Sequence, residues 1–139
     1  MLCDIIRDKC YNQLMKLIRI KNIKTKNTFL SVFQNINRFM RVKRIFFVNS
    51  NKSSLSGDHA HKKCTQVLLS VSGNIKIEII DEKLKKKFFL LKELENYIII
   101  RPKNWVKVHF KKKQKLMVLC DYNYSKSDYI NDLNILKKG

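Results

Sequence analysis

Two histidines lie two residues apart in His59-Ala60-His61, and a run of β-forming residues continues from them through Gln66 to Gly73. Side chains alternate between the two faces of a strand, so residues two apart point to the same side. The pattern therefore predicts that both imidazoles face one cavity. Because the unperturbed pKa of histidine is near neutrality, such a pair suits either acid–base catalysis or half of a metal site.

The residues around the pair discriminate between these two uses. The spacing from His59 through Gln66 to Gly73 resembles the first cupin motif, in which a glutamate at the position of Gln66 completes a three-ligand metal site. The second cupin motif adds a histidine, but Lys107 occupies that position. An amide is a poor metal ligand and an ammonium group repels a cation, so we expect a cupin that works without metal. His109 could approach the pair from a neighbouring strand, which leaves a three-histidine site as a minor alternative.

The length and composition fit one domain. The 139 residues are 45% apolar and include one proline, which is enough for a single core and leaves little chain for a second. We expect residues 15–139 to form one cupin domain and residues 1–14 to be an extension. No run of 18 apolar residues is present, and the first ten residues carry charges where a signal peptide needs an apolar stretch. The expected location is the cytoplasm, away from the membrane.

The formal net charge of +19, from 30 Lys and Arg against 11 Asp and Glu, is typical of nucleic-acid-binding proteins. However, the lysine clusters at 85–87 and 111–113 lie between strand-like runs, where charges usually form solvated turns. No nucleic-acid motif accompanies them, so we expect no nucleic-acid partner. Positive potential also favours a small dianion such as a pyrophosphate, which arginine binds through two parallel hydrogen bonds.

The four cysteines, Cys3, Cys10, Cys64 and Cys120, are scattered and form no Cys-x-x-Cys pair. This pattern predicts reduced and mostly buried thiols rather than a disulfide framework or a zinc site. None of them is predicted to be a nucleophile.

Short β-branched and aromatic runs dominate the chain, at spacings typical of a β-sandwich. Turn signals such as Ser56-Gly57-Asp58 separate several of them. We therefore expect an all-β fold, the jelly-roll β-barrel or double-stranded β-helix of cupins. The predicted strands are residues 29–33, 41–48, 65–71, 74–80, 87–91, 97–100, 106–110 and 116–120.

The end of the chain has a different pattern. Apolar side chains from Tyr129 to Leu136 recur at helical spacing, and Ser127 or Asp128 precedes them as a predicted N-cap. We expect a short C-terminal helix that packs on the outside of the barrel.

Five separate motifs give a more specific resemblance. They are Arg44 to Val48, residues 57–68 with the histidine pair, Pro102-x-x-Trp105, residues 117–119, and residues 121–130 with their Asp-Tyr-Ile ending. In this order and spacing, from about residue 17 to residue 136, the chain resembles the dTDP-sugar 3,4-ketoisomerases.

The resemblance implies a metal-independent isomerase without cofactors. Its substrate would be dTDP-4-dehydro-6-deoxyglucose, whose ketone moves from C4 to C3 through an enediol, for the synthesis of 3-amino-3,6-dideoxysugars of surface glycans. The resemblance also implies a homodimer with exchanged N-terminal strands, in which residues 17–33 cross to the partner.

The reaction requires removal of the C3 proton, which the C4 carbonyl acidifies, and delivery of a proton to C4. We expect one of His59 and His61 to be the C3 base and the other to move protons among O3, O4 and C4. The sequence leaves open which histidine has which role, and it leaves open the C4 configuration of the product.

The expected substrate-binding residues are Arg44 and Arg101 at the pyrophosphate, Trp105 or Phe47 against the thymine or the sugar, and Lys107 or Arg44 beside the enediolate. Each has a structural alternative, such as a core position for the tryptophan or a solvent-exposed strand edge for the first arginine. His109 is expected to be structural.

The chain departs from the family pattern at three places. Phe47 lies where many relatives have tyrosine, residues 54–56 contain no arginine, and Val106 follows the tryptophan where relatives have histidine. These departures affect the expected phosphate and sugar contacts more than the expected reaction class.

Three other functions compete with this one. The first is a dTDP-sugar 3,5-epimerase, which keeps the ketone at C4. The others are a metal-dependent cupin and a non-catalytic module that binds sugar nucleotides or nucleic acid.

Overall fold

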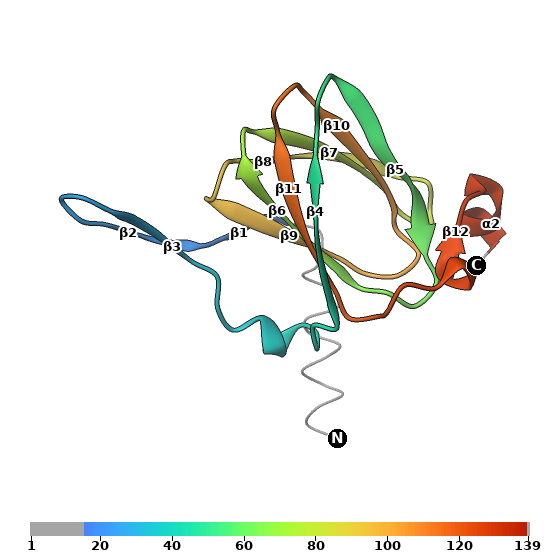
Figure 1. Ribbon diagram of the computed structural model, residues 1–139. Helices are drawn as coiled ribbons and strands as arrows, with labels where there is room; N and C mark the ends of the chain where they lie inside the picture. The colour runs from blue at the N-terminus through green and yellow to red at the C-terminus, as the bar shows by residue number, and fades with distance from the viewer. Residues whose placement is uncertain (1–15, 139) are drawn as a thin grey trace.

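The computed structural model describes residues 16–138. The expected extension at residues 1–14 lies outside these described residues. The described part consists of two five-stranded antiparallel sheets, with strand orders β1-β9-β6-β11-β4 and β12-β5-β10-β7-β8, and a separate two-stranded hairpin, β2-β3 (Figure 1). This arrangement confirms the expected cupin jelly roll. The strands are β1 (Ile18–Arg19), β2 (Lys21–Lys24), β3 (Phe29–Val32), β4 (Arg44–Asn49), β5 (Ser54–His61), β6 (Gln66–Ser72), β7 (Ile75–Ile80), β8 (Lys86–Leu91), β9 (Asn96–Ile100), β10 (Trp105–Phe110), β11 (Lys115–Cys120) and β12 (Tyr129–Ile130).

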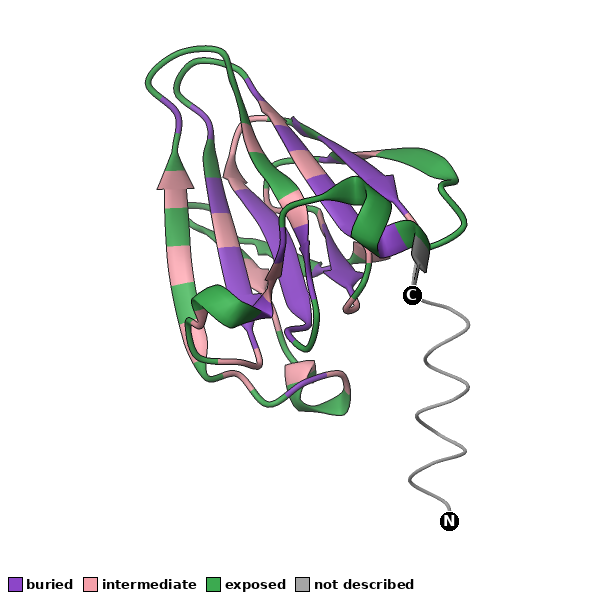
Figure 2. Cartoon of the chain, turned by 90° about the vertical axis from the view of Figure 1, so that its right-hand side faces the viewer, coloured by how far each residue is buried: buried purple, intermediate pink, exposed green. Residues whose placement is uncertain are grey.

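The main core lies between the two sheets and follows from strand alternation. In β10, Val106, Val108 and Phe110 belong to this core, whereas Lys107 and His109 between them point to the outer face of the sheet. Buried residues are concentrated in the strands, and exposed residues in the connections between them (Figure 2). The inward positions of the strands therefore enclose the interior in which the candidate site lies.

The tripeptide that was expected to form a turn, Ser56-Gly57-Asp58, is instead a bulge inside β5. Gly57 and Asp58 have positive φ angles of 77° and 60°, and the β5–β10 register shifts there, so that Val106 pairs with His59 and Lys107 with Gly57. The turn prediction was wrong because a left-handed glycine also suits a bulge, which keeps both strands paired. A Cβ on Gly57 would lie 2.8 Å from the Val106 carbonyl oxygen.

The C-terminal helix is present but begins later than predicted. A 3-10 turn, η2 (Lys126–Asp128), leads into β12, and helix α2 spans Leu133–Lys138. Asp128 does not cap the helix because its buried carboxylate is bonded elsewhere; instead, Asp132 accepts the Asn134 backbone N–H at 2.9 Å. No helix in residues 16–138 is long and apolar enough to cross a membrane.

Helix α2 packs on the outer face of the second sheet, as expected. Leu136 and Ile130 form a small cluster with Trp105, Ala60 and Ile80. The Trp105 indole N–H also donates to the Asp58 carboxylate at 2.9 Å. This cluster fixes the end of the chain beside the histidine pair.

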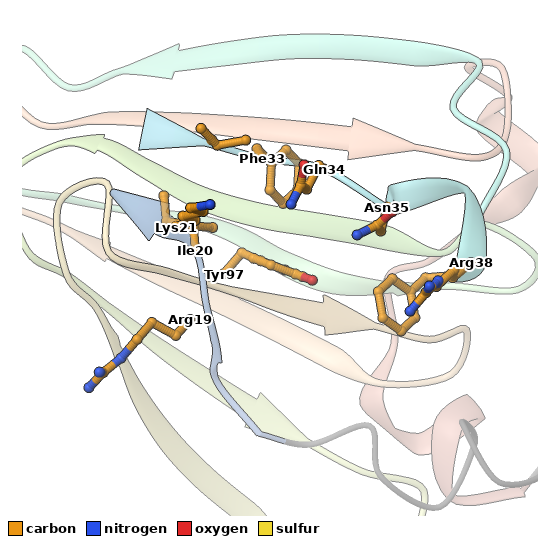
Figure 3. Close-up of a pocket in the computed structure, with 10 residues that line it drawn as sticks. Arg19, Ile20, Lys21, Phe33, Gln34, Asn35, Arg38 and Tyr97 are labelled. Atoms are coloured by element: carbon orange, nitrogen blue, oxygen red, sulfur yellow. The ribbon is translucent and has the colours of Figure 1, made fainter. Parts of the chain in front are cut away.

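The N-terminal segment covers the outer face of the first sheet. Ile20 and Met40 pack with outward residues of that sheet such as Tyr97 and Leu119. A hollow of about 250 Å³ lies between this segment and the sheet; its lining includes Phe33 and Tyr97 (Figure 3). Hairpin β2-β3 leaves the body of the molecule and pairs with no other described strand (Figure 1). The hairpin is connected to the barrel through β1 and the turn η1 (Ile36–Arg38), and the Asn22 side-chain N–H donates to the Leu94 carbonyl oxygen at 3.0 Å.

Replacement of Gly57 by alanine should destabilise the bulge that precedes the histidine pair. A left-handed backbone and a Cβ at 2.8 Å from a carbonyl oxygen are expected to cost about 1–3 kcal/mol of unfolding free energy. Urea unfolding measures this loss, with Ser54→Ala, an exposed change in the same strand, as the control. Equal unfolding midpoints for the two variants would contradict the strained bulge.

Candidate active site

The two histidines of β5 converge, as the sequence predicted. Their ring centroids are 5.0 Å apart, with an angle of 78° between the planes. The Tyr129 ring lies against both, with centroids 4.7 Å from His59 and 4.6 Å from His61. This contact follows from strand register, because Tyr129 of β12 is paired directly with His61. The three rings form one aromatic cluster at the end of the barrel.

A buried carboxylate holds His61. The His61 Nδ1–H donates to Asp128 Oδ2 at 2.8 Å, and the two side chains are 6% and 4% exposed. The other oxygen, Asp128 Oδ1, accepts the Lys63 backbone N–H at 2.7 Å. With Nδ1 as the donor, Nε2 is left with a lone pair, and this buried atom has no hydrogen-bond partner. His61 therefore has the tautomer and the open nitrogen that a general base needs.

The surroundings of His61 act on its pKa in opposite directions. Burial lowers the pKa below the ordinary 6.5, the bond to Asp128 raises it, and the nearby His59 and Arg44 lower it further. The net effect is a lowered pKa, so the imidazole is neutral at pH 7. The Asp128 carboxylate can then stabilise the imidazolium that forms when His61 takes a proton.

His59 is oriented by its own backbone. Its Nδ1–H donates to the Gly57 carbonyl oxygen at 2.9 Å, inside the β5 bulge. This bond leaves Nε2 as the nitrogen for proton exchange, as in His61. His59 is half-buried and lines the cavity, whereas His61 is 5% exposed. The pair thus combines one accessible and one secluded imidazole.

The cavity beside the pair lies between the two sheets and has a volume of about 180 Å³. Its walls are mostly apolar inward residues of β4, β6, β10 and β11, and its polar groups are few. The lining is Phe46, Val48, Ser56, Gly57, His59, Gln66, Leu68, Val106, Val108, Leu116, Val118 and Tyr129. A volume below the roughly 300–1,000 Å³ of drug-sized sites suits one small ring held next to His59.

We identify the cavity at His59 as the candidate site because of the residues that line it, and not because of its volume. The hollow in Figure 3 is larger, about 250 Å³, and is lined by Arg19, Lys21 and Arg38 among others, but by no histidine or carboxylate. A third hollow of about 500 Å³ is lined by His109 on the outer face of the second sheet. There His109 is bonded to Glu78 at 3.0 Å. Among the described residues, the cavity at His59 is lined by a histidine whose ring contacts a second imidazole, His61, and His61 is held by a buried carboxylate.

Arg44 also belongs to this end of the barrel. One guanidinium N–H donates to Cys120 Sγ at 3.4 Å. The guanidinium lies over the rings of Phe46 and Tyr124, 5.4 Å and 5.8 Å from their centroids. A cation held by a thiol and two aromatic faces retains hydrogen-bond capacity for an anionic group.

None of the expected substrate-binding residues, Arg44 included, is among the residues that line the cavity. Phe47 is 54% exposed on the face of β4 opposite to Phe46, which lines the cavity in its place. Trp105 and Lys107 lie on the outer face of β10, where the ammonium group is 3.8 Å from Asp58. Arg101 donates to the Phe39 carbonyl oxygen at 3.1 Å. Strand alternation decides each placement, since a shift of one residue reverses the face.

The cupin metal positions do not assemble a metal centre. Lys107 is on the outer face, and the Gln66 amide N–H donates to Cys120 at 3.6 Å. His109 is also on the outer face, bonded to Glu78 at 3.0 Å, so the alternative of a three-histidine site was wrong. The residues at the motif positions thus do not fit the metal that most cupins bind through them.

Two cysteines that are far apart in sequence, Cys64 and Cys120, lie next to each other near Arg44. Cys64 and Cys120 are both buried and free. The hydrogen bond from Cys64, with the N–H donors of Gln66 and Arg44, lowers the pKa of Cys120 to about 6 against the opposing effect of burial. The reciprocal effect raises the pKa of Cys64. For these two cysteines, the expectation of buried thiols is confirmed.

Comparison with known proteins identifies the family. Residues 13–138 match the model of the family described as "FdtA: WxcM-like, C-terminal". The chain belongs to the WxcM-like (FdtA) family. It is 27% identical to the TDP-4-oxo-6-deoxy-α-D-glucose-3,4-oxoisomerase of Aneurinibacillus thermoaerophilus over 126 residues, which are 88% of this chain and 90% of the relative.

Solved structures of family members have the same fold. The TDP-fucose-3,4-ketoisomerase WlaRA of Campylobacter jejuni is 27% identical, with a TM-score of 0.78 and coverage of 88% of this chain and 93% of that one. The 3,4-ketoisomerase QdtA of Thermoanaerobacterium thermosaccharolyticum is 25% identical, with a TM-score of 0.79 and coverage of 88% and 91%. The latter is a histidine-to-asparagine variant in complex with TDP-4-keto-6-deoxyglucose. The predicted resemblance to sugar-nucleotide 3,4-ketoisomerases is confirmed.

Sequence reasoning missed Asp128 and Tyr129 as site residues of this WxcM-like protein. Both were part of the Asp-Tyr-Ile motif that carried the resemblance, but helical spacing assigned them to the start of a helix. One signal in the sequence could have identified them. Asp128 follows the end of the buried strand β11 by eight residues, and a connection of that length can return the chain to the end of β5.

Replacement of Asp128 by asparagine should change both the tautomer and the pKa of His61. Since the carboxylate raises the pKa of His61, its loss should lower the midpoint of the imidazole titration further and weaken the preference for a proton on Nδ1. NMR of ¹⁵N-labelled histidine measures both properties. Asp121→Asn is the control, because that carboxylate accepts the Thr65 N–H at 2.7 Å and contacts neither histidine. An unchanged His61 titration in Asp128→Asn would contradict the assigned pairing.

Proposed function

We propose that this protein moves the ketone of dTDP-4-dehydro-6-deoxyglucose from C4 to C3 through an enediol. The observation that carries the proposal is the His61–Asp128 pair with its unpartnered Nε2, because the His61 ring contacts His59 and His59 lines a cavity of sugar-ring size. A buried carboxylate that fixes the tautomer of a histidine is the arrangement of a general base. The named substrates and products of the matched relatives support the choice of sugar nucleotide.

In the proposed mechanism, His61 Nε2 removes the C3 proton. The electrons of the C3–H bond form the C3–C4 double bond, and O4 becomes the oxyanion of an enediolate. Asp128 stabilises the resulting imidazolium at Nδ1, 2.8 Å away. O4 takes up a proton, O3 loses its proton as the C3 carbonyl forms, and C4 receives a proton. Two protons leave and two return, so the reaction is balanced without an oxidant or reductant.

His59 suits the transfers at the oxygens. It lines the cavity, and its Nδ1 is occupied by the Gly57 carbonyl oxygen at 2.9 Å. Its Nε2 can therefore give a proton to one enediol oxygen and remove one from the other, directly or through water. This division of roles follows from burial, because the secluded His61 is better shielded from water when it removes a proton from carbon.

Only the sugar ring fits the cavity, so we place the nucleotide outside it. At about 180 Å³, the cavity has no room for the thymidine and the pyrophosphate as well. Arg44, whose guanidinium is oriented by Cys120, Phe46 and Tyr124, is the residue of the expected binding set that we retain for an anionic group. Phe47, Arg101, Trp105 and Lys107 do not reach the cavity and are left out of the proposal.

We further propose that the reaction needs no metal and supplies a 3-keto sugar for conversion into a 3-amino-3,6-dideoxysugar. Metal independence is supported by Gln66 and Lys107, which take two of the four cupin ligand positions and are bonded elsewhere. A 3-ketone next to a C4 hydroxyl is the functional group that an aminotransferase converts to an amine.

The proposal predicts metal-free turnover that depends on His61. The substrate is incubated with the protein in deuterated water with EDTA, and proton NMR is expected to show a 3-keto product with deuterium at C4. His61→Asn should lower the rate by about 10²–10⁴-fold with little effect on nucleotide affinity, because Arg44 is unchanged. His109→Asn, a histidine on the outer face, is the control and should keep full activity.

Other outcomes of that experiment would identify other functions. Exchange at C3 and C5 with the ketone still at C4 would indicate an epimerase. Binding without exchange, unaffected by the loss of His59 and His61 together, would indicate a non-catalytic module. The C4–C5 coupling constant of a 3-keto product would give its C4 configuration.

We also propose a homodimer in which hairpin β2-β3 crosses to the partner. The hairpin pairs only with itself among the described strands and exposes Ile23, Phe29 and Leu30, which are 39%, 59% and 54% accessible. An exposed apolar hairpin of this kind is more stable when it is covered by another surface.

The dimer predicts a specific change in mass. Light scattering should give twice the 16.6 kDa of one chain, and Phe29→Lys combined with Leu30→Lys should shift the population to monomer. Phe88→Lys is the matched control, because Phe88 is 53% exposed on the other sheet. A monomeric parent protein, or a dimer disrupted equally by Phe88→Lys, would contradict the hairpin exchange.

A further inference from the structure

A cluster of three potential metal ligands includes His61 and two residues that lie next to it. His61, Cys64 and Asp128 each offer one ligand atom, and these atoms all lie within 4.8 Å of one another. All three residues are buried, at 5%, 1% and 5% exposure. They come from the end of β5, the loop after it, and the turn η2. None of the cupin motif positions except His61 takes part.

Backbone hydrogen bonds hold this cluster in place. The Lys62 and Lys63 N–H groups donate to the carbonyl oxygen and to the Oδ1 of Asp128, each at 2.7 Å. The Thr65 N–H donates to Asp121 Oδ1 at 2.7 Å. Hydrogen bonds therefore fix the loop on both sides of Cys64. They hold the thiol next to the imidazole and the carboxylate before any metal binds.

We infer that His61, Cys64 and Asp128 form an inhibitory site for a divalent cation of the Zn²⁺ type. One nitrogen, one sulfur and one oxygen from three side chains, with a fourth position left open, is a ligand set that zinc accepts. Tetrahedral zinc places such ligands about 3.3–3.6 Å apart. Ligand atoms that lie within 4.8 Å of one another need to close by at most about 1.5 Å, and the 2.8 Å contact between His61 and Asp128 has to open slightly if both atoms of that contact bind.

Zinc binding and catalysis compete for the same groups. If zinc takes Nδ1 of His61, the hydrogen bond that fixes the tautomer is lost; if it takes Nε2, the lone pair of the base is lost. In both cases turnover stops. Binding as a thiolate releases the Cys64 thiol proton, and coordination through Nδ1 moves the imidazole proton to Nε2, so no electron transfer is involved. The inhibitory effect rests on the proposed function, whereas the binding site does not.

Cys120 provides an internal contrast. Its sulfur already accepts N–H groups from Arg44 at 3.4 Å and from Gln66 at 3.6 Å. The guanidinium charge beside it opposes a second cation. The site is therefore assigned to Cys64, and the neighbouring buried thiol serves as the matched control.

The test uses full-length protein in which Cys3 and Cys10 are changed to serine. Co²⁺ and then Zn²⁺ are added to this protein and to its Cys64→Ala and Cys120→Ala derivatives. The thiolate-to-cobalt charge-transfer absorption is recorded, and the turnover assay follows inhibition by zinc. We expect one equivalent of Co²⁺ with a thiolate band in the parent and in Cys120→Ala. In Cys64→Ala the band should be absent and zinc should bind more than about 100-fold more weakly, since loss of an outer-shell partner alone costs 10–100-fold.

The possible results separate the site from the function. Equal zinc affinity in the parent and in Cys64→Ala, or loss of the thiolate band only in Cys120→Ala, would overturn the assignment. The cobalt band needs no substrate, so it reports the site even if the protein is not an isomerase. Should Cys64→Ala fail to fold, Zn²⁺ must still shift the His61 ring signals and raise the thermal midpoint of the parent. Absence of either effect would overturn the proposal.

Discussion

The hydrogen bond between His61 and Asp128 is the interaction on which the site depends. It joins the end of β5 to a turn 67 residues later in the sequence, and it does so in a place where neither side chain is more than 6% exposed. A carboxylate that is buried this deeply needs partners for both oxygens, and the Lys63 N–H supplies the second. The same carboxylate therefore orients the imidazole that we propose as the base, would balance its charge after proton transfer, and fixes the loop that follows β5.

The remainder of the barrel presents His59 to a confined space and packs His61 against it. The left-handed Gly57 permits the bulge that lets its carbonyl oxygen hold His59, and the β12 pairing places Tyr129 against both imidazoles. Inward positions of four strands supply the apolar walls. A small, mostly apolar cavity strengthens the few polar contacts in it, which favours charge development at positions that are set in advance.

The sequence was informative where local periodicity and motif spacing determine structure. The alternation of apolar residues predicted seven of the long strands to within a few residues, and two histidines at spacing two predicted converging rings. Prediction from the sequence failed where the local structure or the direction of a side chain depends on which strands pair. Gly57 and Asp58 have the composition of a turn, and only the partner β10 makes them a bulge. Phe47 and Phe46 are chemically equivalent, and only the register of β4 decides which one faces the cavity. Asp128 was assigned to a helix cap because its real partner is 67 residues away in sequence.

The position of β12 has a consequence for how the site is completed. Eleven of the twelve described strands, β1 to β11, end by Cys120, so both sheets of the barrel are built apart from the segment that carries Asp128 and Tyr129. These two residues reach the site because β12 pairs with the end of β5. If that short pairing opened, the barrel would keep both histidines and most of the cavity wall, but the carboxylate that fixes the tautomer of His61 would be lost. Local opening of one two-residue strand would therefore change the chemistry of the site while the fold stays intact.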